Sequence, residues 1–295
     1  MSGHSFEGRV AVVTGAGRGI GRAHALLLAK RGASVVVNDL GGSMEGVGAD
    51  SEPASAVAAE IHAAGGVAIA DTSDVSTAEG AQALVDAAKS AFRRVDILIN
   101  NAGIIRWAGF PNADADNLAA HLAVHVAGSF NTARAAWPHM VEERYGRIVM
   151  TSSAGVFGLP VNLSYATAKA AVIGLTRSLS TAGAAHDILV NVIAPAATTR
   201  MASDTASEPM PPELVAPMVA FLAHEDCPVS GEIYSAGAGR FARIFIAETA
   251  GYVHPAPDPT IEDIAEHWAM INDETGYSVP ADLMAWSDRF TAHLR

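Results

Sequence analysis

A glycine-rich turn constrains the fold of this chain more than any other feature of its sequence. Residues 14–21 read Thr-Gly-Ala-Gly-Arg-Gly-Ile-Gly, after an apolar run at 10–13 and before a helix-like run at 22–30. Strand, turn and helix in this order are typical of a phosphate-binding corner, because N–H groups at the start of a helix attract phosphate and glycine lets the backbone approach it. The turn therefore predicts a dinucleotide site; the alternative is a plain tight turn between a strand and a helix.

Short apolar runs alternate with alanine-rich stretches through most of the chain. Such runs are typical of the buried strands of a parallel sheet that has helices on both faces. Because crossovers between parallel strands are right-handed, the alternation predicts an α/β fold with a doubly wound parallel sheet of the Rossmann type. The expected strands are 10–13, 34–38, 67–70, 97–100, 148–151 and 189–193, and the expected helices are 22–30, 54–64, 78–91, 117–143 and 166–183.

Two stretches depart from this alternation. Residues 202–217 combine several prolines with small and polar residues, and we expect them to form a mobile flap over the site. Residues 241–295 have an apolar spacing of their own and a helix-like run at 261–271. We therefore expect a dinucleotide-binding and catalytic domain at 1–240 and a C-terminal extension at 241–295 that packs on it.

Charge and cysteine content argue against several classes of function. The 295 residues carry a formal net charge of −12 and no run of Lys and Arg, so a nucleic-acid partner is not expected. Cys227 is the only cysteine, which rules out an internal disulfide and a cysteine-rich metal site. No apolar run approaches the ~18 residues of a membrane span, and residues 1–8 lack the apolar core of a signal peptide. We expect a cytoplasmic protein with no metal and no membrane partner.

Asp39 ends the second predicted strand and indicates which dinucleotide the site prefers. A carboxylate there can accept hydrogen bonds from both adenosine ribose hydroxyls and would repel a 2′-phosphate. Arg18, in the glycine turn, could instead meet a 2′-phosphate, but Asp39 is expected directly at the ribose, so we predict NAD rather than NADP as cofactor. The alternative is that Asp39 only caps the turn before Gly41 and Gly42.

The ends of two further predicted strands complete the expected dinucleotide site. Asp74 and Val75 follow the third strand, where a carboxylate can accept a hydrogen bond from the adenine amino group. Small residues after the fourth strand leave room for the adenosine. The predicted cofactor-binding residues of these segments are Gly15, Arg18, Gly19, Ile20, Gly21, Asp39, Asp74, Val75, Asn101, Ala102 and Gly103.

Tyr165 and Lys169 are the candidates for proton transfer. Residues four apart share one face of a helix, and the predicted strand before this helix carries Ser152 and Ser153 at its carboxyl end. A free tyrosine titrates at about pH 10, so a tyrosine base at neutral pH needs a nearby cation, which an ammonium group supplies. Alone, the pair would more often be a solvated helix face. Downstream of a dinucleotide turn, it indicates an acid–base pair.

Taken in order, these motifs resemble those of the short-chain dehydrogenase/reductase family. The resemblance covers 14–21, Asp39, Asp74, 100–103, 152–153, Tyr165, Lys169 and Pro195. It implies that Tyr165 is the acid/base, that Lys169 lowers the pKa of this tyrosine and binds the nicotinamide ribose, and that a serine orients the substrate oxygen. It also implies that Pro195 and either Thr198 or Thr199 contact the nicotinamide, and that the protein is a homodimer or homotetramer.

The resemblance leaves two members of the catalytic set open. Spacing from the tyrosine selects Ser152, whereas alignment through the strand at 148–151 selects Ser153. We expect Ser153, because shifting the register of a strand costs more than shortening a loop. His125 stands where many members of the family have asparagine. It either relays protons through water or is a core histidine whose hydrogen bonds are satisfied.

A closer resemblance covers nearly the whole chain and extends past Arg240. Segments at 37–42, 128–130, 134–137, 145–153 and 237–239 are similar to the (3R)-hydroxyacyl-CoA dehydrogenase part of peroxisomal multifunctional enzyme type 2. It implies NAD-dependent oxidation of a small molecule, a (3R)-hydroxyacyl-CoA or a steroid side-chain acyl-CoA thioester. Two alternatives stay open: a carbonyl reductase or dehydrogenase for free sterols, terpenoids or acyl-carrier substrates, and a non-catalytic NAD-sensing module.

Overall fold

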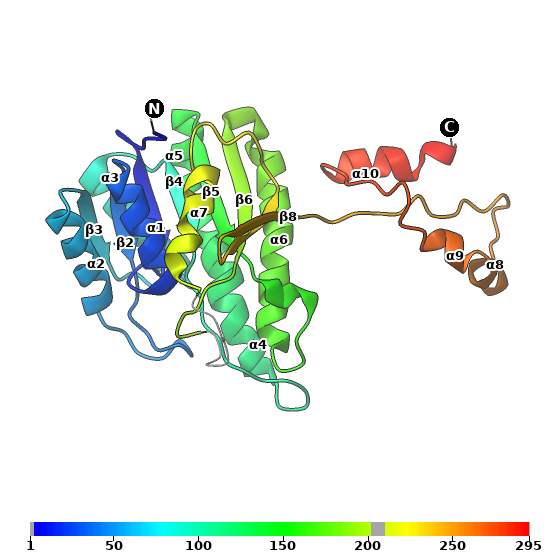
Figure 1. Cartoon of the computed structure of the whole chain (residues 1–295), viewed down its shortest axis with the longest axis horizontal. Coiled ribbons are helices and arrows are strands. Elements are labelled where there is room, and N and C mark those ends of the chain that lie inside the picture. Colours follow the sequence, from blue (N-terminus) through cyan, green and yellow to red (C-terminus); the bar gives the residue numbers. More distant parts are fainter. Residues whose placement is uncertain (1–2, 202–209, 295) are drawn as a thin grey trace. The chain divides into compact units, whose positions relative to one another are not determined.

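The computed structural model describes residues 3–201 and 210–294, and its centre is an eight-stranded sheet with the order β3-β2-β1-β4-β5-β6-β7-β8 (Figure 1). From β3 to β7 every neighbouring pair runs parallel. Residues 202–209, half of the segment expected to form a flap, lie outside the described residues. The strands are β1 Val10–Thr14, β2 Ser34–Asn38, β3 Val67–Asp71, β4 Ile97–Asn100, β5 Gly146–Thr151, β6 Ile188–Pro195, β7 Ile233–Gly237 and β8 Arg240–Ile244.

The strand order reverses at β1, which pairs with β2 on one side and with β4 on the other. The chain therefore leaves these neighbouring strands towards opposite ends of the sheet. A crevice forms at such a point, outside the carboxyl ends of the strands, and it is where ligands bind in open parallel sheets. Both β1 and β4 are buried at every position, so the two walls of this crevice are fixed by the core.

Two layers of helices cover the sheet. In one layer α1 packs on α2 and α7, and in the other α3 packs on α5 and α4 packs on α6. A π-helical turn, Leu122–Ala127, joins α4 to α5. The arrangement confirms the predicted doubly wound α/β fold. The helices are α1 Gly19–Lys30, α2 Glu52–Ala63, α3 Ala78–Phe92, α4 Ala115–His121, α5 Gly128–Glu143, α6 Leu163–Gly183 and α7 Ala216–Leu222.

The seventh strand is absent from the strands expected from the sequence. β7 reads Ile-Tyr-Ser-Ala-Gly and lacks the continuous apolar run that marks the other buried strands. Its neighbour β6 supplies the pairing, from Val192 opposite Ile233 to Pro195 opposite Ala236. Tertiary pairing therefore determines this strand, because its local propensity is weak.

Contacts within the chain divide it into two compact units, Met1–Arg243 and Ile244–Arg295. None of the described residues of the second unit is buried. So small a unit without a core of its own cannot account for its own stability. That it packs on the catalytic domain stays a prediction. The helices of this unit are α8 Ile261–Glu266, α9 Trp268–Ile271 and α10 Leu283–Phe290.

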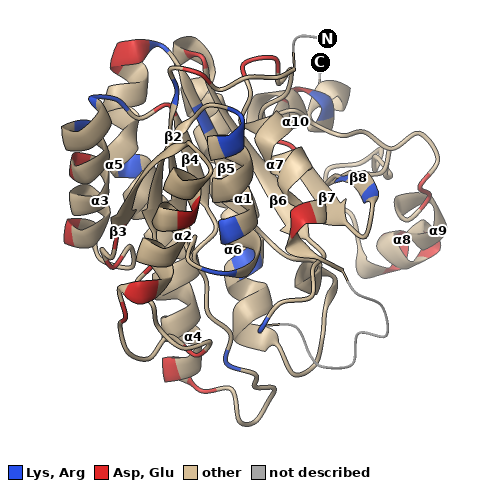
Figure 2. Ribbon diagram, turned by 60° about the vertical axis from the view of Figure 1, so that its left-hand side comes forward, with Lys and Arg blue, Asp and Glu red and all other residues tan. Residues whose placement is uncertain are grey.

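Charged residues are largely kept out of the sheet. The strands β1, β2, β4, β6 and β7 contain none, and Figure 2 shows basic and acidic residues interspersed over the helices and loops. The carboxyl edge of the central strands is instead made polar by hydroxyl and amide side chains such as Thr14 and Asn100. Among the helices that the structure describes, none combines the length and the apolar character needed to cross a membrane.

His24 is a buried polar residue inside α1. Only 1% of its surface is exposed, and neither of its ring nitrogens has a hydrogen-bond partner among the described residues. Burial lowers the pKa of His24 to about 3, from an ordinary value of 6.5. Between these two pH values the unfolded chain binds a proton that the folded chain does not bind. The contribution of neutral His24 to the free energy of unfolding is therefore fully present above about pH 6.5, and it is lost as the pH falls towards 3.

We predict that His24→Leu raises the free energy of unfolding by ~1–2 kcal/mol at pH 7.5, because it removes two unpaired buried nitrogens. The variant should also lose much less stability between pH 6.5 and pH 4. Denaturant unfolding at a series of pH values measures both effects. His293→Gln, at an exposed histidine, is the control and should behave as the wild type. A His24 variant with wild-type stability and the wild-type acid slope would contradict the assignment.

Candidate active site

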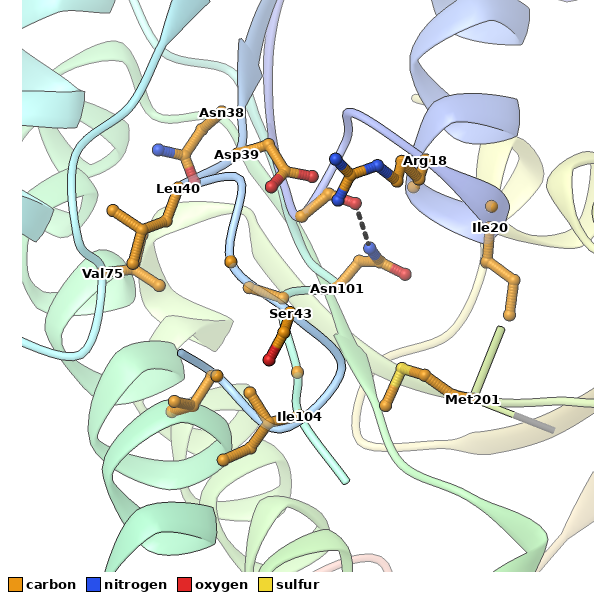
Figure 3. Close-up of a pocket in the computed structure, with 18 of the residues that line it drawn as sticks. Arg18, Ile20, Asn38, Asp39, Leu40, Ser43, Val75, Asn101, Ile104 and Met201 are labelled. Carbon is orange, nitrogen blue, oxygen red and sulfur yellow. Dashed lines mark hydrogen bonds between the residues drawn. The ribbon is translucent and has the colours of Figure 1, made fainter. Parts of the chain in front are cut away.

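A cavity of about 390 Å³ opens at the carboxyl ends of the central strands (Figure 3). The glycine turn, the end of β2, the segment after β3 and the segment after β4 surround it. The predicted cofactor residues that line it are Gly15, Arg18, Gly19, Ile20, Gly21, Asp39, Asp74, Val75, Asn101, Ala102 and Gly103. Motifs that are far apart in the sequence thus meet at one cavity.

The glycines of the turn have two different roles. A Cβ built on Gly15 would lie 2.8 Å from Ala102 Cα, and one built on Gly21 would collide with the Gly15 carbonyl and the Asn101 amide. These two glycines let the turn pack against the segment after β4. Gly19 has a φ of +53°, and a Cβ there would meet Thr199 alone among the described residues, at 3.5 Å. The backbone at Gly19, where α1 begins, is therefore open towards the cavity and suits a diphosphate.

The Asn101 side chain joins the two sides of the cavity. Its Nδ2 donates to the carbonyl oxygens of Thr14 and Gly15, both at 3.0 Å, and Figure 3 draws one of these bonds. In return, Thr14 Oγ1 accepts hydrogen bonds from the backbone N–H groups of Asn101 and Ala102, at 3.1 and 3.0 Å. The glycine turn and the end of β4 are therefore held in one fixed arrangement.

Asp39 lies at the end of β2 with 8% of its surface exposed, and its carboxylate faces the cavity. Oδ2 accepts a hydrogen bond from Gly17 N and Oδ1 accepts one from Gly41 N, both at 2.8 Å. A carboxylate has about four acceptor positions, so two remain for ribose hydroxyls. Asp39 does cap the turn at Gly41, as the alternative expected, and this role is compatible with binding a ribose.

Tyr165 and Lys169 lie one turn apart on α6, and Lys169 Nζ is 5.5 Å from the centre of the Tyr165 ring. Lys169 Nζ also donates to the carbonyl oxygen of Thr151, at 2.7 Å, with only 3% of the residue exposed. Burial lowers the pKa of Lys169 to about 7. Burial raises the pKa of Tyr165, and a hydrogen bond with Ser153 opposes that rise. The family resemblance implied a lowered pKa for Tyr165, but the surroundings that this chain provides raise it instead. A lowered pKa would therefore need a further group at the site.

The two candidate serines face different surroundings. Ser153 is the side chain that opposes the rise in the pKa of Tyr165, and its Oγ accepts a hydrogen bond from Gly155 N at 3.0 Å. Ser152 is 1% exposed, and its Oγ donates to the carbonyl oxygen of Lys169 at 2.8 Å. The structure therefore places Ser153 beside the phenol, while Ser152 ties the end of β5 to the backbone of α6.

His125 lies in the π-helical turn and meets the Tyr165 ring edge-on, with ring centres 5.3 Å apart. Its other face stacks on His121, at 5.9 Å. Nε2 is 2.8 Å from the carbonyl oxygen of Ile104, and Nδ1 has no partner among the described residues. Burial and the nearby Lys169 hold the pKa of His125 well below its usual value, so its ring is neutral. Nε2 therefore has a hydrogen-bond partner, and Nδ1 remains able to bind water.

The segment after β6 approaches the cavity through Thr199 rather than Thr198. Thr199 lines the cavity beside Gly19. Thr198 turns to Met210 instead: its N–H donates to the Met210 carbonyl at 2.7 Å, and its Oγ1 accepts from Met210 N at 3.2 Å. Pro195 ends β6 and does not line the cavity, nor do Tyr165 and Lys169.

Several lining residues were not expected from the sequence. They come mainly from the loop after β2 and from the segment after β6. In neither segment does the sequence pattern indicate which side chains face the cavity. They are Asn38, Leu40, Gly42, Ser43, Gly46, Ser73, Ser76, Ile104, Val124, Arg200 and Met201. For Ser43 and Gly46, the position shortly after Asp39 was the one sequence signal that could have indicated a place at the cavity.

Comparisons with known proteins agree with this geometry. A family model described as short chain dehydrogenase matches residues 9–209. A putative short-chain type dehydrogenase/reductase from Mycobacterium tuberculosis is 42% identical over 92% of this chain and 97% of the relative. Peroxisomal multifunctional enzyme type 2 from Drosophila melanogaster is 42% identical over 91% of this chain, which spans 46% of that relative.

A solved structure of full-length peroxisomal multifunctional enzyme type 2 from Drosophila melanogaster superposes with a TM-score of 0.82 at 33% identity. The superposition covers 98% of this chain and 50% of that chain. The chain therefore corresponds to about half the length of the multifunctional relative.

Matched serine substitutions test the placement of the two hydroxyls. We predict that Ser153→Ala lowers kcat by about 100-fold or more, because it removes a hydroxyl aimed at the site of charge development. Ser152→Ala should keep kcat within a few-fold and lower the free energy of unfolding by about 1 kcal/mol, because it breaks a buried hydrogen bond. Steady-state kinetics and denaturant unfolding of both variants measure these effects. The reverse pattern would assign the role to Ser152.

Proposed function

The chain belongs to the short-chain dehydrogenase family, and we propose that it uses NAD to oxidise a secondary alcohol, with a (3R)-hydroxyacyl-CoA or a steroid side-chain acyl-CoA as substrate. The observation that carries the reaction type is the convergence of Ser153, Tyr165 and Lys169 at the carboxyl end of β5, with His125 between Tyr165 and Ile104 of the cavity wall. The comparison with multifunctional enzyme type 2 over 91% of this chain supports the choice of substrate.

The residues of the cavity fit a nicotinamide dinucleotide. The open backbone at Gly19 would hold the diphosphate, Asp39 the adenosine ribose, and Asp74 with Val75 the adenine. Thr199, in place of Thr198, would contact the nicotinamide together with Pro195. The bound cofactor supplies the acceptor for the hydride that leaves the alcohol carbon. Everything else in the reaction is done by side chains of this chain.

Those side chains move a proton and hold an oxygen. The phenolate of Tyr165 takes the proton of the substrate hydroxyl, and Ser153 donates to the oxygen as it becomes a carbonyl. Lys169 stabilises the phenolate by its charge and its closeness. His125, neutral and edge-on to the Tyr165 ring, has a nitrogen, Nδ1, that no described residue contacts by a hydrogen bond and that can bind a water through which this proton leaves the site.

Cationic and apolar groups near the site support an acyl-CoA. Arg200 and Arg106 donate to the backbone carbonyls of Gly42 and Glu45, at 3.2 and 2.7 Å, and each keeps further N–H groups for phosphate. Exposed aromatic side chains stand on the two loops next to the catalytic residues, among them Phe110 and Phe157. These would suit a long or bulky acyl group.

Two other functions are tested at the same time. A carbonyl reductase or dehydrogenase for free sterols, terpenoids or acyl-carrier substrates would use the same Ser153, Tyr165 and Lys169. A non-catalytic NAD sensor would need only the cavity, and the intact pair of Tyr165 and Lys169 argues against it. Assembly as a homodimer or homotetramer, and a place in the cytoplasm, are parts of the same proposal.

The test is formation of NADH at 340 nm with a panel of 3-hydroxyacyl-CoAs of both configurations, steroid side-chain CoA thioesters and free secondary alcohols. Turnover restricted to (3R)-acyl-CoAs supports the proposal. Turnover of free alcohols alone keeps the chemistry and discards the CoA thioester. Tight NAD binding without turnover of any alcohol supports the sensor.

Asp39 gives a prediction for the cofactor. Asp39→Asn keeps an acceptor for one of the N–H groups of Gly17 and Gly41, puts an NH2 group opposite the other, and removes the charge that repels a 2′-phosphate. We predict that the ratio of kcat/KM for NAD to kcat/KM for NADP falls at least about 10-fold, the change that 1.4 kcal/mol produces. Arg18→Gln is the matched control and should not raise the use of NADP. An unchanged ratio in the Asp39 variant would exclude Asp39 as the discriminating group.

The pKa of Tyr165 gives a prediction for the pH dependence. Oxidation needs the phenolate, and burial raises the pKa of Tyr165, so the phenolate fraction grows as the pH rises above neutrality. We predict that kcat/KM for oxidation rises with pH between 7 and 9, close to tenfold per unit where Tyr165 is mostly protonated. Carbonyl reduction, which needs the protonated phenol, should not rise there. Lys169→Met should shift the oxidation profile to higher pH; a flat oxidation profile in the wild type would contradict the assignment of the base.

A further inference from the structure

Three side chains converge on the α-carbon of Gly155, in the loop between β5 and α6. A Cβ built on Gly155 would lie 3.3 Å from Ser153 Oγ, 3.5 Å from Asn162 Nδ2 and 3.7 Å from Tyr165 Cε1. Two of these residues are the ones that hold the reacting oxygen in the proposed reaction. The carboxamide of Asn162 therefore borders the same small space as the serine hydroxyl and the phenol ring.

The backbone of Asn162 is held firmly in place. Its N–H donates to the Leu159 carbonyl at 3.1 Å, its carbonyl accepts from Ala166 N at 2.9 Å, and it forms a β-bridge with Ala108. Only 4% of the residue is exposed. The side chain cannot move far, because its own backbone joins the start of α6 to the neighbouring loop.

Among the described residues, neither Nδ2 nor Oδ1 of the Asn162 side chain has a hydrogen-bond partner. Asn162 is the N-cap residue of α6, a position where an asparagine side chain usually accepts a hydrogen bond from the first turn, but it makes no such bond. Its Oδ1 is buried without a partner among the described residues. A buried amide with unused hydrogen-bonding capacity is costly, so its place beside Ser153 and Tyr165 indicates a role towards a ligand.

We propose that Asn162 donates a hydrogen bond from Nδ2 to a second oxygen of the substrate, the thioester carbonyl two carbons away from the reacting carbon. Ser153 and Tyr165 hold the oxygen on the reacting carbon, and Asn162, next to them, reads the carbonyl that distinguishes a 3-hydroxyacyl thioester from a simple secondary alcohol. This inference rests on the proposed function, since it assumes a 3-hydroxyacyl substrate. Asn162 is thus a specificity-determining residue.

The experiment compares two substrates that differ only in that carbonyl. One is a (3R)-hydroxyacyl thioester, and the other is the matching thioether, with a methylene group in place of the carbonyl. Both are oxidised at the same carbon, so both report the proton and hydride steps. The enzyme variants are Asn162→Leu, which keeps the branched shape and removes the donor, and Asn162→Gln, which keeps a donor on a longer side chain.

We expect Asn162→Leu to lower kcat/KM for the thioester by about 10- to 100-fold, the range for one lost hydrogen bond to a buried partner. Its kcat/KM for the thioether should stay within about threefold of the wild type. Asn162→Gln should recover part of the loss on the thioester. NAD affinity should match the wild type in both variants, and neither variant should be less stable to heat than the wild type, because the side chain makes no hydrogen bond to the described residues.

Three outcomes decide the matter. An equal loss on both substrates assigns Asn162 a structural role and overturns the inference while leaving the proposed function intact. No loss on either substrate also overturns it. A wild-type enzyme that oxidises the thioether and simple alcohols but not the thioester overturns the proposed function, and this inference with it.

Gly155→Ala provides a second measurement. Gly155 has no positive φ, so alanine is compatible with the backbone, and its methyl group would enter the space between Ser153, Asn162 and Tyr165. We expect KM to rise several-fold for the thioester and the thioether alike, because the methyl group narrows the space for both. An unchanged KM for both would show that the substrate does not occupy this space, which would remove the basis of the inference.

Discussion

The site depends on the reciprocal hydrogen bonds between Asn101 and the end of β1. The Asn101 amide donates to the carbonyls of Thr14, the last residue of β1, and Gly15, the first residue of the turn. A buried carbonyl without a partner would cost about 1–3 kcal/mol, so this one side chain keeps the turn closed. Gly21 and Gly15 are needed because the amide and the next residue come so near.

The sequence could predict most of the dinucleotide half of the site because a parallel sheet gathers the carboxyl ends of its strands at one edge. Asp39, Asp74 and Asn101 each follow a recognisable strand, and so their meeting follows from topology. The sequence could not predict which of two neighbouring side chains faces the cavity. Thr198 turns away from the cavity because it exchanges hydrogen bonds with Met210, which leaves Thr199 at the cavity. Met210 lies in a segment whose sequence has no regular pattern, so this contact could not be predicted. Asn162 was missed for the same reason, since no strand end marks it.

In the proposed catalytic half of the site, burial shifts the pKa of the acid and the pKa values of the bases in opposite directions. Burial raises the pKa of Tyr165 and lowers the pKa values of Lys169 and His125, so burial favours the neutral form of each. A site of this kind avoids the large cost of isolated buried charge. It becomes able to hold a phenolate only when a positive charge is near, and Lys169, poised near neutral pH, can supply that charge at small cost. Periodicity alone places Tyr165 and Lys169 on one face, but it cannot reveal this balance.

Backbone hydrogen bonds link the loops around the cavity in series. Ile105 N donates to the Met44 carbonyl at 3.0 Å, which ties the segment after β4 to the loop after β2. Further along that segment, Ala108 pairs with Asn162 and accepts from Leu163 N, at the start of the helix that carries Tyr165. A ligand that orders the loop at 43–46, beside Asp39, therefore restrains the segment at 104–109 and, through it, the start of α6. In the proposed reaction, cofactor binding and substrate recognition would be joined in this way by contacts that neither ligand needs to touch.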